Sequence, residues 1–206
     1  MAALQFAAAD EREELARAEV YGLLAALYVG PPSAQLHAQL QVAVTDAPER
    51  GAFLEASWRE LVGAARRLPN DRIEAEYADL FVGVGKPEIL PYASFHVTGR
   101  LHDRPLVDLR RDLGALGLER PQGVNETEDH LAGLCEVMRY LIAGDDVGVS
   151  NLANQRRFHD AHLRPWIESF CDGLAAHPRA DFYAALARFT RDFFAIEAQA
   201  FDMLDA

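Results

Sequence analysis

The sequence predicts an all-α protein, a single-domain helical bundle that extends over residues 1–206. Apolar residues recur at the spacing of amphipathic helices along most of the chain, and we find no alternating strand pattern of useful length. Of the 206 residues, 50% are hydrophobic, which is enough to bury one sizeable core without disulfides or metals. We find no internal repeat and no low-complexity segment that would indicate a second domain.

The first helix is predicted over residues 10–28. Asp10 and Glu13 have the spacing of a capping box, which marks a helix start. Gly30-Pro31-Pro32 ends this helix, because proline lacks the N–H group that a continuing helix needs. A weaker helix over about 33–44 follows. The apolar stripe of the first helix consists of Val20, Leu23, Leu24, Leu27 and Tyr28.

Two further helices are predicted over residues 51–68 and 71–82. The first ends in Arg66-Arg67 before Pro69, which suits the negative end of a helix dipole. After the second, glycines and prolines break the pattern, and we expect a loop through residue 95. This loop is unusually apolar, so its side chains must either fold back into the core or form an exposed apolar patch.

A helix over residues 105–116 closes at Gly117, and the clearest helix of the chain follows over 125–143. Asn125 and Glu128 supply a capping box for this second helix. Its apolar face consists of Leu131, Leu134, Cys135, Met138, Leu141 and Ile142.

The last third of the chain is predicted to be helical as well. A link rich in glycine and aspartate over 144–150 leads into a helix from about 151, in which Pro165 marks a kink or a second start. The final helix, over 180–204, is rich in aromatic residues.

The charge of the chain restricts its partners. The formal net charge of −12 argues against binding to nucleic acid or anionic membranes, whose phosphates attract Lys and Arg. It suits a basic partner, although acidity also serves solubility alone. An export signal begins with basic residues, and residues 1–9 contain none. No apolar stretch approaches the roughly 20 residues that are needed to cross a bilayer. We therefore expect a cytoplasmic protein without stable membrane insertion.

Signatures of catalysis, metals and cofactors are missing from the sequence. Cys135 and Cys171 lie far apart and belong to no Cys-x-x-Cys pair, which predicts two buried thiols. Gly83-Val84-Gly85-Lys86 lacks the third glycine and the Ser or Thr of phosphate-binding loops. His159 and His162 are three residues apart, but no Glu-x-x-His motif accompanies them. We expect no catalytic residue, no metal and no cofactor.

Glu126, Asp129 and His130 form the sharpest polar cluster, at the start of the helix predicted over 125–143. In a helix Asp129 would point away from the apolar face, and Gly133, one turn later, would let another chain approach closely. Such carboxylates could cap the helix, serve as acid and base groups of a small hydrolase using Asp129 and His130, or receive a basic peptide. Because no nucleophile or metal motif accompanies them, we favour the peptide site.

Two motifs stand in order along the chain. An aromatic-x-x-Leu-Phe run is followed by a turn with two glycines and by Pro-Tyr-x-Ser-Phe, and Glu-x-x-Asp-His comes later. Together they resemble the motifs of the TorD/DmsD family of redox-enzyme maturation chaperones, related to the NarJ-type chaperones. The resemblance covers most of the chain from about residue 15, and Val84 and Thr127 replace prolines of the family pattern. The matching residues are Tyr77, Leu80, Phe81, Gly83, Gly85, Pro91, Tyr92, Ser94, Phe95, Glu126, Asp129 and His130.

The resemblance implies a helical chaperone, a monomer or dimer, that binds the twin-arginine signal peptide of the catalytic subunit of a molybdenum oxidoreductase and guards it until the cofactor is inserted. Asp129 and His130 would supply polar contacts to the peptide. The apolar side of the peptide groove would consist of Tyr77, Leu80, Phe81, Pro91 and Tyr92. The alternative is an assembly chaperone of the NarJ type, which docks on the body of the enzyme. We expect the segments 81–95 and 126–130 to form two walls of one groove.

Overall fold

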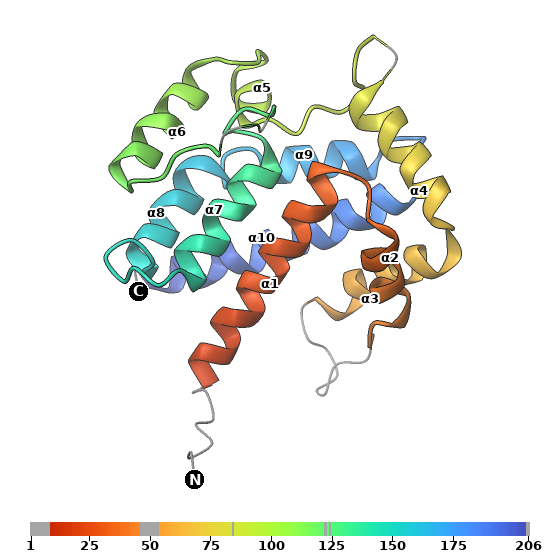
Figure 1. Cartoon of the computed structure of the whole chain (residues 1–206), viewed down its shortest axis with the longest axis horizontal. Helices are drawn as coiled ribbons and strands as arrows, with labels where there is room; N and C mark the ends of the chain where they lie inside the picture. Colours follow the sequence, from red (N-terminus) through yellow and green to blue (C-terminus); the bar gives the residue numbers. More distant parts are fainter. Residues whose placement is uncertain (1–8, 46–53, 84, 122, 124, 205–206) are drawn as a thin grey trace.

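The computed structural model describes residues 9–45, 54–83, 85–121, 123 and 125–204, and this part of the chain is an all-α bundle (Figure 1). The described residues contain no β-strand, and their strand-like pairing is limited to an isolated antiparallel β-bridge between Tyr92 and His130. None of the described helices is long and apolar enough to span a membrane. The elements are α1 (Ala9–Val29), α2 (Ala34–Val42), α3 (Glu55–Arg67), α4 (Asn70–Tyr77), the π-helical turn η1 (Ala78–Val82), α5 (Ala93–Thr98), α6 (Arg104–Ala115), α7 (Leu131–Ala143), α8 (Leu152–His162), α9 (Ile167–Ala175) and α10 (Phe182–Met203).

The centre of the bundle is formed by α1, α7 and α10. α1 and α7 lie side by side and run in opposite directions, while α10 passes behind α1 in the view of Figure 1 and packs against α3 and α9. The buried apolar side chains form one cluster to which these helices and α8 contribute. Tyr21 of α1 packs edge-on against Phe193 and Phe194 of α10, with ring centroids 4.9 and 5.7 Å apart. The predicted all-α class is confirmed; the extent of a single domain over residues 1–206 stays a prediction.

The early helices follow the local sequence signals. α1 ends at Val29, just before the prolines, and α2 begins where the Ser33 hydroxyl oxygen accepts the Leu36 N–H at 3.2 Å. The helix predicted over 51–68 is α3, and residues 51–53 lie outside the described residues. The side chain of Asp10 lies outside them too, so its capping box stays a prediction.

Two predicted boundaries are wrong. The helix predicted from residue 125 begins at Leu131, because the backbone of residues 129–131 bonds instead to residues 91–93, and His130 takes the capping position expected of Asn125. The loop expected through residue 95 ends earlier, since α5 begins at Ala93.

The break near Pro165 is a second helix start. α8 ends at His162 and α9 begins at Ile167. Trp166 lies between them, almost fully buried, and its indole N–H donates to the His162 carbonyl at 2.7 Å. A buried indole needs such an acceptor, and this contact links the start of α9 to the end of α8.

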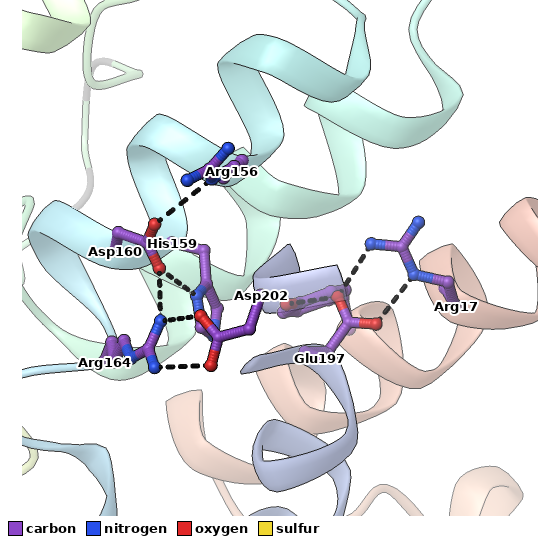
Figure 2. A network of polar contacts seen from close by, with 8 residues as sticks. Arg17, Arg156, His159, Asp160, Arg164, Glu197 and Asp202 are labelled. Carbon is purple, nitrogen blue, oxygen red and sulfur yellow. Dashed lines mark hydrogen bonds and ion pairs between the residues drawn. The ribbon is translucent and has the colours of Figure 1, made fainter. Parts of the chain in front are cut away.

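A polar network joins α1, α8 and α10 (Figure 2). Glu197 of α10 is 2% exposed and accepts from Arg17 Nε at 2.7 Å and Arg17 Nη2 at 2.8 Å. The Tyr21 hydroxyl donates to the same carboxylate at 3.0 Å. Nearer the chain end, Arg164 makes a bidentate pair with Asp202 at 2.7 and 2.8 Å. The network ties the amino-terminal helix to the carboxyl-terminal one.

Glu76 caps α10 from a distant part of the chain. Its carboxylate accepts the N–H groups of Asp181 at 2.8 Å, Phe182 at 3.1 Å and Tyr183 at 2.8 Å. These are donors that the first turn of a helix leaves without intrahelical partners, and a negative charge there is favoured by the helix dipole.

We expect Glu76→Ala to lower the free energy of unfolding by about 2 kcal/mol, because three N–H groups lose a charged acceptor. Urea denaturation followed by circular dichroism measures the loss. Glu74→Ala, which removes an exposed carboxylate of the same helix, should change stability by less than about 0.5 kcal/mol. Equal losses in the two variants would rule out the cap.

Candidate functional site

The two motif segments meet at residues 91–94 and 129–131. That 81–95 and 126–130 form two walls of one groove stays a prediction. The Ala93 N–H donates to the Asp129 carbonyl at 3.0 Å, and the Leu131 N–H donates to the Pro91 carbonyl at 2.8 Å. Between these bonds Tyr92 faces His130, with ring centroids 5.0 Å apart in an edge-on arrangement. A short antiparallel pairing therefore joins residues 91–93 to residues 129–131 and sets the start of both α5 and α7.

Asp129 is fully buried in this junction. Its Oδ2 accepts the Ser94 N–H at the start of α5 at 2.9 Å, and its Oδ1 accepts the Thr127 hydroxyl at 2.6 Å. Both carboxylate oxygens thus bind the protein's own chain. The expected exposed position of Asp129 is wrong, because residues 125–130 are not helical and the helical projection does not apply to them.

His130 serves α7 in a similar way. Its Nδ1 accepts the Ala132 N–H at 3.1 Å, so this nitrogen carries no proton and the ring caps the helix. Burial lowers the pKa of His130, which keeps the imidazole neutral near pH 7. Nδ1 is engaged by the backbone and Asp129 by Ser94 and Thr127, so the pair does not form the acid–base couple that a hydrolase would need.

Tyr92 and Glu126 form the polar contact nearest the surface of the junction. Both side chains are half-buried, and the Tyr92 hydroxyl donates to Glu126 Oε2. Burial, together with the Glu126 carboxylate, raises the pKa of Tyr92, so the phenol keeps its proton and stays a donor. The Arg120 guanidinium donates to the Glu126 backbone carbonyl at 2.9 Å.

Most side chains of the first motif pack into the core. Leu80 is fully buried, and its carbonyl accepts the N–H groups of Glu88 at 3.0 Å and Ile89 at 2.9 Å. Phe81 packs against Tyr77 and Tyr183 with ring centroids 5.0 and 5.1 Å away. Pro91 and Ser94 are buried and Phe95 is half-buried. These apolar side chains fold back mostly into the core.

The turn after this motif requires glycine. η1 ends where the Gly83 N–H donates to the Ala78 carbonyl at 2.8 Å, five residues back. Gly83 has φ +65°, and a Cβ atom there would collide with the Lys86 backbone. Gly85, at φ +98°, has the same conformational requirement. π-helical turns of this kind often mark functional regions.

An open cavity of about 530 Å³ adjoins the junction. It lies between the carboxyl-terminal half of α1 and the length of α7, and the end of α6 with residues 118–121 encloses its other side. Glu126 and His130 are the predicted site residues that line it. Most of the remaining lining is apolar or small: Ala25, Ala26, Val29, Leu113, Leu118, Pro121, Ala132, Gly133, Val137 and Tyr140.

The sequence did not reveal that Val29 of α1 and Tyr140 of α7 line this cavity. Val29 is 59% exposed and Tyr140 is 40% exposed, yet in sequence each adjoins a core residue of the same helix, Tyr28 and Leu141. In the sequence the local signal is an apolar residue near a helix end. This signal does not distinguish a residue that lines a binding site from one that packs in the core.

Gly133 has a different role from the one expected. A Cβ atom on Gly133 would lie 3.2 Å from the Glu128 carbonyl oxygen. The glycine therefore admits the chain's own segment 125–130, which crosses close to α7, and it also lines the cavity.

Carboxylates surround the cavity, but they differ in their partners. Glu128 pairs with Arg110 at 2.9 Å and Glu136 pairs with Arg139 at 2.8 Å. Glu126 bonds to a neutral phenol, so its negative charge is not balanced by that partner. Within the described ranges, no three His, Cys, Asp or Glu side chains come together as a metal site, and Cys135 and Cys171 are buried free thiols. The cavity can thus offer apolar contacts beside the Glu126 carboxylate, and Arg120 also belongs to its lining.

Comparison with known proteins identifies the family. A family model described as the nitrate reductase delta subunit matches residues 48–172, more than half of the chain. The chaperone protein TorD of Vibrio cholerae serotype O1 is 30% identical over 204 residues, which cover 91% of this chain and 93% of the relative. The chain belongs to this family of TorD-type chaperones. The TorD chaperones of Vibrio vulnificus and Aliivibrio fischeri are 26% and 28% identical, over 81% and 55% of this chain and 86% and 57% of those relatives.

The resemblance inferred from the two motifs is therefore confirmed, and as a TorD-type protein the chain is a chaperone. The range matched by the family model contains η1, the junction at Tyr92 and the whole of α7. The α1 wall of the cavity lies before that range.

Proposed function

We propose that this TorD-type chaperone assists the maturation of a molybdenum oxidoreductase in the cytoplasm by binding the twin-arginine signal region of its catalytic subunit before export. The observation that carries the proposal is the cavity of about 530 Å³ beside the Tyr92–Glu126 contact. Its volume falls within the range of about 300–1,000 Å³ that is typical of ligand sites.

The chemistry of the cavity suits such a segment. Twin-arginine signals combine an arginine pair with an apolar stretch. Apolar side chains gain free energy when they leave water for the cavity floor formed by Ala132, Gly133 and Val137. An arginine guanidinium forms strong, often bidentate hydrogen bonds with a carboxylate such as that of Glu126. The net charge of −12 adds long-range attraction for a basic peptide.

Calorimetric titration of the full chain with a synthetic twin-arginine signal peptide tests the proposal. We expect binding that weakens as salt is raised, because exposed charges are screened. Glu126→Gln should weaken binding about tenfold, since the charged acceptor is lost while the side-chain volume stays. A peptide with glutamines in place of the arginine pair should lose a similar factor on the wild-type chain and nothing further on the variant.

The matched control is Glu74→Gln, which removes an exposed charge from α4 and lies outside the cavity lining. Its affinity should equal that of the wild type. Absence of binding by the wild-type chain, or equal binding of the arginine and glutamine peptides, would refute the proposal. Capture of a signal-deleted catalytic subunit by the chaperone would instead support docking on the enzyme body.

A further inference from the structure

We infer that Arg120 is a specificity-determining residue of the cavity. It favours a peptide that carries an acidic side chain directly beside its arginine pair and disfavours a peptide that carries a further basic residue there. The inference rests on the proposed function and adds a selection rule for the peptide. It starts from the position of Arg120 in the cavity lining, next to Glu126.

The end of α6 determines where Arg120 lies. The helix closes in a left-handed turn at Gly117, where φ is +69°, and the Leu118 N–H donates to the Leu113 carbonyl at 2.9 Å, as in a Schellman motif. Two residues later, Nη1 of Arg120 donates to the Glu126 carbonyl at 2.9 Å. Arg120 is thus held by the helix end before it and by its own bond to the segment that leads into α7.

Most of the Arg120 guanidinium is available to a ligand. A guanidinium has five N–H donors, and the bond to the Glu126 carbonyl uses one of them. The side chain is exposed, and it forms no ion pair with a carboxylate of the described residues. Among the described residues of the lining, Arg120 is the sole arginine or lysine, whereas Glu119, Glu126, Glu128 and Glu136 supply carboxylates. Two of these carboxylates are already paired with arginines outside the lining.

Opposite charges therefore belong to one small part of the cavity. The Arg120 guanidinium bonds to the main chain of Glu126, and the Glu126 carboxylate bonds to the Tyr92 hydroxyl. A ligand arginine that binds Glu126 comes near a second cation, and like charges at short range repel. An acidic side chain next to that arginine offsets the repulsion and accepts charge-assisted hydrogen bonds from Arg120. A lysine in the same place adds to the repulsion.

This selection opposes the one that net charge alone produces. A chain with a net charge of −12 attracts the most basic peptide. Long-range attraction therefore ranks lysine above glutamine and glutamine above glutamate at the position beside the arginine pair. Arg120 ranks them in the reverse order, so the ranking at this one position separates a local contact from the overall field.

Calorimetric titration of the full chain with a peptide series tests the rule. The peptides share one twin-arginine signal and carry Glu, Gln or Lys at the residue before the arginine pair or, in a second series, at the residue after it. In one series we expect the Glu peptide to bind about threefold more tightly than the Gln peptide, and the Lys peptide to bind more weakly than both. This preference should fade at high salt, because exposed charges are screened.

Arg120→Gln removes the cation and keeps a hydrogen-bonding side chain, so it should abolish the preference for the Glu peptide. The matched control is Arg72→Gln, which removes an equal charge from an exposed position of α4 outside the cavity lining. The control should keep the order of the wild type. Both positions are exposed, so both variants should retain the circular dichroism spectrum and the stability of the wild type.

Three results would overturn the inference. The first is a wild-type order of Lys, Gln and Glu, or equal affinities, in both series. The second is a preference for the Glu peptide that persists in Arg120→Gln. The third is an equal loss for all peptides on Arg120→Gln, which would show that Arg120 only holds Glu126 in place. Each of these leaves the proposed function intact, whereas absence of binding by the Gln peptides to the wild-type chain contradicts the proposed function itself.

Discussion

Glu197→Ala is expected to lower the free energy of unfolding by about 3–4 kcal/mol, the largest single loss that we predict for this protein. Glu197 is 2% exposed and accepts from both Arg17 and the fully buried hydroxyl of Tyr21. Removal of the carboxylate leaves a largely desolvated guanidinium and a buried phenol without their acceptor, and the cost of such orphaned groups exceeds that of a lost surface contact.

Urea denaturation of Glu197→Ala beside Asp202→Ala measures this difference. Asp202 forms a bidentate pair with Arg164 in the same region (Figure 2), but its side chain is 56% exposed. Water screens an exposed ion pair, so this pair is expected to contribute little to stability. Similar losses in the two variants would show that the Arg17–Tyr21–Glu197 contacts do not hold α1 to α10.

Asp129→Ala is expected to cost about 2–3 kcal/mol of stability, because the buried N–H of Ser94 and the hydroxyl of Thr127 lose their acceptor. Asp129 is therefore a positioning residue. It holds the start of α5 against the segment that leads into α7, and so places Tyr92 next to Glu126.

The matched variant is Glu126→Ala, on the same segment but half-exposed. We expect it to change stability by less than about 1 kcal/mol while weakening peptide binding about tenfold or more. Denaturation and calorimetry on both variants separate the two roles. An Asp129→Ala protein that is as stable as the wild type but no longer binds peptide would show that Asp129 contacts the peptide directly.

Local sequence signals predicted most of the helices. The stripe that includes Leu24, Leu27 and Tyr28 places α1, and the prolines at 31 and 32 end it, because both signals depend only on near neighbours in the sequence. Pro165 likewise separates α8 from α9.

The same kind of signal was misleading at residues 125–130. The spacing of Asn125 and Glu128 fits a capping box, but the backbone of Asp129 and Leu131 bonds to Pro91 and Ala93, almost 40 residues away in sequence. A local pattern carries no information about that partner. The helix consequently starts at Leu131, and Asp129 is buried instead of exposed.

The candidate site was predicted in part. The neighbouring positions of Tyr92 and His130 followed from two motifs that resemble those of one family, and the structure confirms them. The places of Val29 on α1 and Tyr140 on α7 in the cavity lining were not predicted, because an apolar residue on a helix has the same pattern whether it faces the core or an open groove. That distinction depends on which elements pack around the helix.

Intermolecular nuclear Overhauser effects between the chaperone and a bound twin-arginine signal peptide test most directly the proposal that the groove between α1 and α7 is the peptide site. With isotope-labelled methyl groups on the full chain, we expect contacts from the peptide's apolar side chains to Val29, Ala132 and Val137, all of which line the cavity. Contacts confined to exposed methyl groups elsewhere, such as those of Val42 and Val107, would contradict the proposal.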